Sequence, residues 1–271
     1  MLTSIDVELE AVSSGLLPFN SNSLYIHALF FKLVSEDNET LGESIHNRDG
    51  FKPYTLSSLR GGKKNNWNIE IIANNKYRFR ATFLNDDIFI AFFNSALLYY
   101  NQSKPVKLDE LDFKITKLVL KQNESFEELT ANNVINDNNF ELIFTSPTSF
   151  RVKGRNYLFP DSSLVFKSYF DKWNAFCPEK LRIAESEINQ IITACFPVKH
   201  HLYTELLDMG KYKVVGFKGK CQYEVEKTLD EILFGKLNWL LRFSRYSGTG
   251  YKTTMGMGQT TLAKKDKGKV L

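Results

Sequence analysis

Four glycines lie close together in the stretch YSGTGYKTTMGMGQTTL, residues 246–262. They form two Gly-x-Gly pairs, Gly248 with Gly250 and Gly256 with Gly258. Because glycine adopts positive φ and admits close neighbours, exposed amides in such a loop can hold phosphate groups. The glycines of a dinucleotide-binding site follow a strand and open a helix, whereas these follow a predicted helix, which argues against that site. Two interpretations stay open: a loop that contacts phosphates, or a helix-to-strand connection whose packing requires glycine.

The chain has four histidines, and imidazole exchanges protons near neutral pH because its unperturbed pKa is about 6.5. We expect His46, in SIHNRDGFKPY, to lie in a polar turn between a helix and a strand. His27 interrupts an apolar helical stretch, which is also typical of a buried core histidine. We interpret the adjacent His200 and His201 as structural, since neighbours on a strand point to opposite sides. The histidines and acidic residues do not form a metal-ligand pattern, so we expect no metal and no other cofactor.

Two rows of basic residues are predicted on strand faces, where side chains at a period of two share one side. The first row, in KYRFR, is Lys76, Arg78 and Arg80. The second row, in RVKGR, is Arg151, Lys153 and Arg155, provided that the chain stays extended. Such rows usually form a solvated face. Two of them, together with Lys211, Lys213, Lys218 and Lys220 along another strand, favour a surface that follows phosphates.

Composition limits the class of protein. The 271 residues carry a net charge of +4 and are 43% hydrophobic, which suits a globular protein of one or two domains. This mild charge permits a polyanionic partner without implying binding by charge alone. The three cysteines are far apart and form no Cys-x-x-Cys pair, so a disulfide framework and a zinc ribbon are both unsupported. With no signal-peptide pattern and no apolar run near ~20 residues, we expect a cytoplasmic protein without membrane contact.

The predicted element order in the first half is β-α-β-β-α-β, the order of the ferredoxin-like or RRM-like fold. A polar stretch at residues 123–139 is the expected seam, which places the domains at 1–125 and 126–271. In the second half we expect helices and strands that could repeat this architecture. The predicted helices are 162–176, 179–195 and 229–246, and the strands are 140–146, 211–225 and 258–264. We therefore predict an α+β protein with two tandem ferredoxin-like domains and a C-terminal glycine-rich loop.

Four stretches occur in the order of a known family: SIHNRDGFKPYTLSSL, IFTSPTSFRVKGRNYLFPDSSLVFKSYFDKWN, VVGFKGKCQYEV and GTGYKTTMGMGQ. Together they resemble the CRISPR-associated RAMP endoribonucleases that cut precursor CRISPR RNA within its repeats. The resemblance spans nearly the full chain. It implies that the glycine-rich loop lies against the RNA. Lys252, Thr253 and Thr254 are either candidates for phosphate contacts or solvated loop residues.

The resemblance also implies a reaction, in which the ribose 2′-hydroxyl attacks the adjacent phosphate without a metal ion and leaves 2′,3′-cyclic phosphate and 5′-hydroxyl ends. This reaction needs a base, an acid and positive charge near the phosphate. By resemblance, His46 is the principal acid or base, while His27 is either its partner or a core residue. Lys52 either places an ammonium near the phosphate or is an ordinary exposed lysine. Phe31 departs from relatives that carry a catalytic tyrosine on this helix.

The partner implied by the resemblance is CRISPR repeat RNA, while an effector complex and a homodimer are left open. One rival hypothesis is a noncatalytic RNA-binding subunit of a CRISPR effector complex, which would not need His27 or His46. A second rival is a metal-dependent nuclease. Cleavage in EDTA separates these possibilities.

Overall fold

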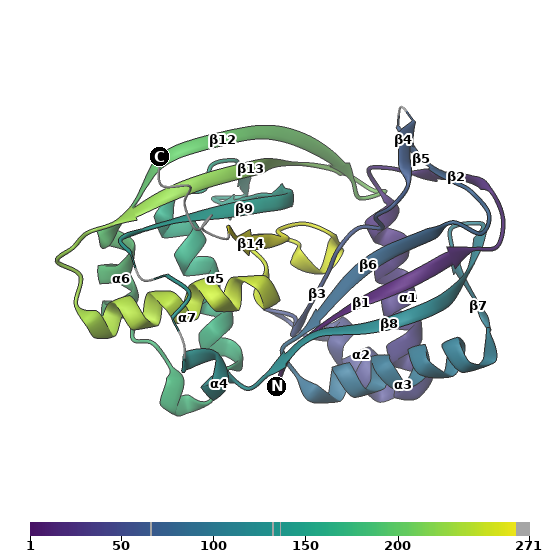
Figure 1. The fold of residues 1–271 in the computed structure, drawn as a ribbon, viewed down its shortest axis with the longest axis horizontal. Helices are drawn as coiled ribbons and strands as arrows, with labels where there is room; N and C mark the ends of the chain where they lie inside the picture. The colour runs from purple at the N-terminus through teal and green to yellow at the C-terminus, as the bar shows by residue number, and fades with distance from the viewer. Residues whose placement is uncertain (66, 132, 136, 264–271) are drawn as a thin grey trace, which may run out of the picture.

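The computed structural model describes residues 1–65, 67–131, 133–135 and 137–263. Two units lie side by side, each an antiparallel sheet with helices packed against one face (Figure 1). The glycine-rich segment and β14 (Thr260–Leu262) lie where the two units meet. The predicted α+β class is confirmed by this arrangement.

The first unit has the strand order β3-β6-β1-β8-β7. Its strands are β1 (Leu2–Ala11), β3 (Tyr54–Leu56), β6 (Lys76–Phe83), β7 (Pro105–Leu108) and β8 (Leu111–Glu124), and its connecting helices are α1 (Asn22–Asp37) and α3 (Asp86–Gln102). Along β1 the period of two turns Ile5, Val7 and Leu9 into the core beside these helices. Without β7, this is the predicted ferredoxin-like order.

The first unit contains a helix and a small sheet in addition to its ferredoxin-like elements. One is a short helix, α2 (Glu39–Asn47), which follows α1. The other is a small sheet with the order β2-β5-β4. Its strands are β2 (Gly15–Pro18), β4 (Lys63–Asn65) and β5 (Asn68–Ile71).

The second unit has the strand order β12-β13-β9-β14, which is again ferredoxin-like. Its strands are β9 (Asn139–Thr148), β12 (Cys195–Asp208), β13 (Lys213–Val225) and β14, and a hairpin is formed by β10 (Phe150–Val152) and β11 (Arg155–Tyr157). Its helices are α4 (Phe126–Thr130), α5 (Ser162–Phe176), α6 (Glu185–Ala194) and α7 (Glu231–Ser247), with 3-10 turns η1 (Glu179–Leu181) and η2 (Thr253–Met255). Two tandem ferredoxin-like units are therefore present, as predicted.

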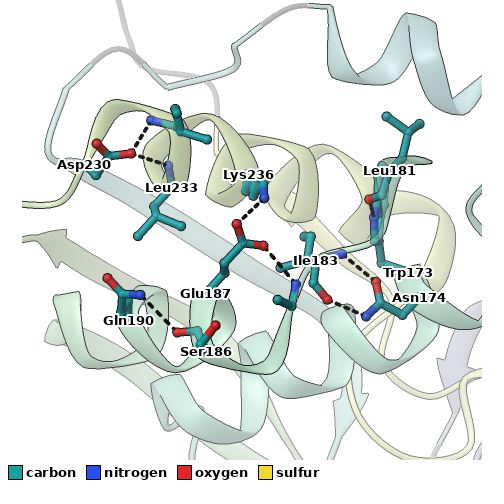
Figure 2. Close-up of polar contacts among 12 residues, drawn as sticks. Trp173, Asn174, Leu181, Ile183, Ser186, Glu187, Gln190, Asp230, Leu233 and Lys236 are labelled. Atoms are coloured by element: carbon teal, nitrogen blue, oxygen red, sulfur yellow. Dashed lines mark hydrogen bonds and ion pairs between the residues drawn. The ribbon is translucent and has the colours of Figure 1, made fainter. Parts of the chain in front are cut away.

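Polar contacts hold the helices of the second unit together (Figure 2). Trp173 Nε1 donates to the carbonyl of Leu181 at 2.8 Å, and the amide side chain of Asn174 bonds both backbone groups of Ile183 at 2.8 and 3.0 Å. Lys236 on α7 pairs with Glu187 on α6 at 2.5 Å. The contacts of Trp173 and Asn174 hold α5 against the segment that follows it. The same helix carries Lys172, which contacts the glycine-rich segment.

The two units are joined by buried contacts as well as by the chain. Leu2 and Leu84, which belong to the first unit, pack in the core of the second. Thr82 Oγ1 on β6 donates to the carbonyl of Tyr246 at 2.6 Å, and Gln259 Nε2 donates to the carbonyl of Leu56 at 3.2 Å. The end of α7 and the glycine-rich segment are thus held against β3 and β6.

Some elements differ from the sequence-based expectation. The predicted helix over 179–195 is wrong, because η1 and α6 are separate and the chain enters β12 at Cys195. His200 and His201 lie on this strand and are exposed. The polar turn expected around His46 is also wrong, because that residue lies in the last turn of α2. Among the described residues, no helix is long and apolar enough to cross a membrane.

Candidate active site

The first unit brings His27 on α1, His46 on α2 and Tyr54 on β3 into one cluster around Phe31. The ring centroid of Phe31 lies 4.9 Å from that of His27 and 5.6 Å from that of His46, both in edge-to-face contact. The hydroxyl of Tyr54 lies 3.4 Å from Nε2 of His27. The predicted pair of histidines therefore shares one site. Tyr54 joins the two histidines through its hydroxyl.

The two histidines have different surroundings. His27 is half-buried, whereas His46 is exposed. Burial lowers the pKa of His27 to about 4, with further lowering by the positive charges of His46, Lys252 and Lys52. Burial raises the pKa of the Tyr54 phenol, and a hydrogen bond with Thr254 opposes that rise. At neutral pH the His27 imidazole is therefore neutral and can accept a proton.

Lys52 caps the C-terminal end of α2. Its ammonium donates to the carbonyls of Ile45 at 2.7 Å and His46 at 3.0 Å, and also to the carbonyl of Arg48. These carbonyls have no partner within the helix, and a cation at this end also complements the helix dipole. Lys52 thereby fixes the turn that carries His46, a role the sequence did not indicate. Its action beside a phosphate stays a prediction.

The four glycines of the loop all have positive φ, and their neighbours belong to the protein itself. A Cβ atom on Gly258 would lie 2.2 Å from the carbonyl oxygen of Thr249, and one on Gly256 would lie 2.6 Å from Cβ of Ser23 on α1. Gly248 and Gly250 are similarly enclosed by backbone oxygens. Packing within the chain therefore accounts for the glycines, which supports the second interpretation of the motif. Contact of this loop with RNA stays a prediction.

The loop places selected side chains at the histidine cluster. Gly256 forms a bridge with Ser57, directly after β3, and η2 packs against both β3 and α1. This brings Thr254 to the Tyr54 hydroxyl and the charge of Lys252 close to His27. Thr253, predicted as a phosphate contact, is buried, and its methyl group lies against the glycines. Thr254 is therefore the threonine that faces the candidate site.

A buried lysine that sequence reasoning missed holds the start of the loop. Lys172 on α5 donates to the carbonyls of Ser247 at 3.0 Å, Gly248 at 3.2 Å and Gly250 at 3.4 Å. Burial lowers the pKa of Lys172 to about 7. The spacing could have revealed it, because Lys172 follows Tyr169 by three positions and so lies on the apolar face of its helix.

The first predicted basic row exists, but Glu8 on β1 pairs with two of its members. The Glu8 carboxylate lies 3.0 Å from Lys76 and 2.7 Å from Arg78, and these contacts, with Arg78 first, lower the pKa of Glu8 to about 2. Nε of Arg80 donates to Ser4 Oγ at 2.8 Å, and burial lowers its pKa to about 10. The row is thus partly neutralised within the protein.

The prediction that the second set of basic residues forms a row along one strand is wrong. Arg151, Lys153 and Arg155 do not lie on one extended strand, because Lys153 and Gly154 both have positive φ and form the turn between β10 and β11. Arg151 lies opposite Asn156, and Arg155 lies opposite Val152. The two arginines therefore point to opposite faces of the hairpin. Binding of RNA by these three basic residues stays a prediction.

Comparisons with known proteins agree with this architecture. Two models match the chain, the CRISPR Cas6 N-terminal domain over residues 7–136 and the CRISPR-associated endoribonuclease Cas6 over residues 142–260. The chain belongs to the Cas6 family. A Cas6 endoribonuclease of Streptococcus thermophilus is 24% identical over 217 residues, which cover 78% of this chain and 80% of that protein.

Solved Cas6 structures share the fold over nearly the whole chain. A Cas6 product complex has a TM-score of 0.80 at 23% identity and covers 97% of this chain and 100% of its own. Thermus thermophilus Cas6 has a TM-score of 0.72 at 22% identity, covering 97% of this chain and 98% of its own. Membership of the Cas6 family confirms the resemblance drawn from the four sequence stretches and places the chain among CRISPR-associated endoribonucleases. Within the described residues, His, Cys, Asp and Glu side chains form no cluster of three that could hold a metal ion.

Proposed function

We propose that this protein cleaves precursor CRISPR RNA within its repeats by attack of a ribose 2′-hydroxyl on the adjacent phosphate, without a metal ion. The observation that carries the proposal is the meeting of His27, His46 and Tyr54 with Lys252 and Thr254 of the glycine-rich loop. Family membership supports an endoribonuclease. Solved relatives described as a product complex, a substrate mimic complex and a RAMP protein binding RNA substrates support RNA as the ligand.

The surroundings of the two histidines suggest different roles. His27 accepts the proton of the 2′-hydroxyl, because burial and nearby cations keep its imidazole neutral at physiological pH, which leaves a ring nitrogen free to take that proton. The exposed His46 donates a proton to the leaving 5′-oxygen. Lys252 supplies positive charge for the oxygens of the phosphorane, and Lys52 orients His46 through the end of α2.

The test is cleavage of an end-labelled repeat RNA in EDTA, beside the same RNA with a 2′-deoxy substitution at the scissile nucleotide. We expect a single cut in the first RNA, with a 2′,3′-cyclic phosphate end, and none in the second. His46→Ala and His27→Ala should each slow single-turnover cleavage about 100-fold or more. His200→Ala is the matched control, because that histidine is exposed on β12 in the other unit.

Three outcomes would contradict the proposal in different ways. Tight binding with no cleavage by the wild type would favour the noncatalytic RNA-binding subunit. Loss of cleavage in EDTA, restored by a divalent cation, would favour the metal-dependent nuclease. Cleavage by His46→Ala at the wild-type rate would overturn the assignment of the acid. Binding to an effector complex and homodimer formation stay predictions to be tested by copurification and by solution mass.

A further inference from the structure

A cavity of about 290 Å³ lies apart from the histidine cluster, between the small sheet of the first unit and the β12–β13 hairpin of the second. Its lining includes Asn20, Ser21, Trp67, Asn68, Asp208 and Lys213. The two sides are joined by a hydrogen bond from the amide of Asp208 to the carbonyl of Asn20 at 3.0 Å. Figure 1 shows the β12–β13 hairpin reaching across to the first unit at this place.

Trp67 is the unusual member of this lining, because its side chain is 72% exposed. Its backbone is nevertheless fixed, since its carbonyl accepts a hydrogen bond from the amide of Phe19 at 2.7 Å. The other tryptophans differ: Trp173 is fully buried, and Trp239 stacks on it at 6.0 Å. An indole held at the rim of a cavity and left open to water is a flat surface available for stacking.

The charge around the cavity is mainly positive. Lys63 and Lys64 on β4 are exposed, as are Lys211 and Lys213 at the opposite hairpin. Lys64 lies over the ring of Phe19 at 4.0 Å, so it is held close to the rim. The carboxylate of Asp208 accepts a hydrogen bond from the amide of Gly210 at 2.8 Å, and Glu70 lies across from Lys63 in the sheet. Exposed aromatic rings among lysines are typical of surfaces that bind single-stranded nucleic acid.

We propose that this cavity binds one unpaired nucleobase of the RNA substrate, stacked on the indole of Trp67. The proposal rests on the proposed function, because the base belongs to the same RNA. Stacking tolerates any base, since every base has a π-face. The amides of Asn20 and Asn68 and the hydroxyl of Ser21 supply donors and acceptors for a base edge. The volume, at the lower end of the range for small-molecule sites, suits a single base.

The cavity is connected to the candidate active site by two elements. Ser21 is the N-cap of α1, and His27 follows it on the same helix, about 9 Å further along the axis. On the other side, the ring of Tyr212 in the β12–β13 hairpin lies 4.9 Å from the ammonium of Lys252. A single strand that reaches the histidine cluster can therefore place a neighbouring nucleotide in the cavity.

The experiment uses the full chain and a repeat RNA made uncleavable by 2′-deoxy substitution at the scissile nucleotide. We expect Trp67→Ala to raise the Kd about tenfold, within the range measured for loss of one stacked base, and Trp67→Phe to restore most of the affinity. Tyr100→Ala is the matched control, because this aromatic side chain is 45% exposed on the distant helix α3 and should leave the Kd unchanged. RNA should quench the tryptophan fluorescence of the wild type and not that of Trp67→Ala.

A second measurement identifies the base. Each unpaired nucleotide of the RNA is replaced in turn by an abasic one, and one replacement should weaken binding to the wild type about tenfold without weakening binding to Trp67→Ala further. Wild-type affinity of Trp67→Ala for the RNA, or additive losses at every abasic position, would overturn this proposal and leave the proposed function intact. Failure of the wild type to bind repeat RNA would overturn both. Preferential binding of the Trp67 surface to a protein partner in place of RNA would also overturn it.

Discussion

Lys52 in the first unit and Lys172 in the second make the same kind of contact in different surroundings. Each side-chain nitrogen lies within hydrogen-bond distance of three backbone carbonyls at or just after the end of a helix, α2 for Lys52 and α7 for Lys172. Lys52 is partly exposed, whereas Lys172 is buried with 6% of its surface accessible. Water can replace the first lysine at its carbonyls but has little access to those of the second.

The difference shows how the two units contribute to one site. Lys52 fixes the turn that carries His46, and Lys172 fixes the start of the loop that carries Lys252 and Thr254. The contact that is closed to solvent should matter more for stability. The contact that is open to solvent should matter mainly for the local orientation of His46.

The largest expected effect is that of Lys172→Met. Loss of the amine leaves buried carbonyls without a donor, so we expect the free energy of unfolding to fall by about 3 kcal/mol at pH 9. Lys52→Met is the matched variant and should lose about 1 kcal/mol or less, because water takes the place of its ammonium. Urea denaturation of both variants measures the two values. Equal losses of stability in the two variants would contradict the proposed effect of solvent access.

Next in size is the effect of adding a methyl group to the loop. Gly258→Ala places Cβ 2.2 Å from the carbonyl oxygen of Thr249 at positive φ, whereas Gly154→Ala has the same sign of φ but no atom within 4 Å. We expect Gly258→Ala to cost about 2 kcal/mol more in stability than Gly154→Ala, which carries only the backbone strain. Thermal unfolding of the pair, with cleavage assays, tests this. A similar loss in both would show that the loop moves aside freely.

The pH dependence of stability should separate the buried lysine from the buried histidine. Folding lowers the pKa of Lys172 from 10.5 to about 7. Between pH 7 and pH 10.5 the unfolded chain therefore carries a proton on this side chain that the folded chain lacks. Stability from this group therefore rises with pH above about 7, by about 2 kcal/mol between pH 7 and pH 9, and Lys172→Met abolishes the rise.

His27 affects the stability of the protein over a lower range of pH than Lys172 does. Its pKa falls from 6.5 to about 4 on folding, so its contribution is present above pH 6.5 and is lost as the pH falls toward 4. His27→Gln should flatten that part of the stability curve without changing the part above pH 7. If the stability of the wild type did not change with pH between 7 and 9, the lowered pKa of Lys172 would be contradicted. If it did not change between pH 4 and 6.5, that of His27 would be contradicted.

The smallest expected effect on stability, with a distinct effect on activity, is that of Lys52→Met. Because Lys52 bonds the carbonyl of His46 at 3.0 Å, we expect cleavage at saturating RNA to slow several-fold while RNA affinity stays within twofold. Lys52→Arg should recover part of the rate by donating to the same carbonyls. A rate lowered about 100-fold or more would instead favour an ammonium beside the scissile phosphate, the role that the resemblance implies.

Alternation and helical periodicity predicted the first ferredoxin-like unit, because strands half exposed to water carry a period of two in the sequence itself. In the second unit they predicted three of the four strands and missed β12. Helix α2 was missed because its nine residues, ETLGESIHN, are mostly polar and short. The hairpin at Lys153 and Gly154 was missed because its arginines also fit an extended strand. His46 and His27 were found as candidates, but the contact of His27 with Tyr54 joins residues 27 positions apart and has no local signal.

By itself, the sequence determined the family, the ferredoxin-like order of the first unit, the place of the glycine-rich loop and the histidines worth testing. Each of these features depends on the periodicity of nearby residues or on short motifs that are continuous in the sequence. Only the tertiary structure decided that Lys172 is buried against the loop, that Glu8 pairs with two of the basic residues on β6 and that Lys52 caps α2. These partners come together only when separate helices and strands pack, so the charge and burial of each side chain are properties of the fold.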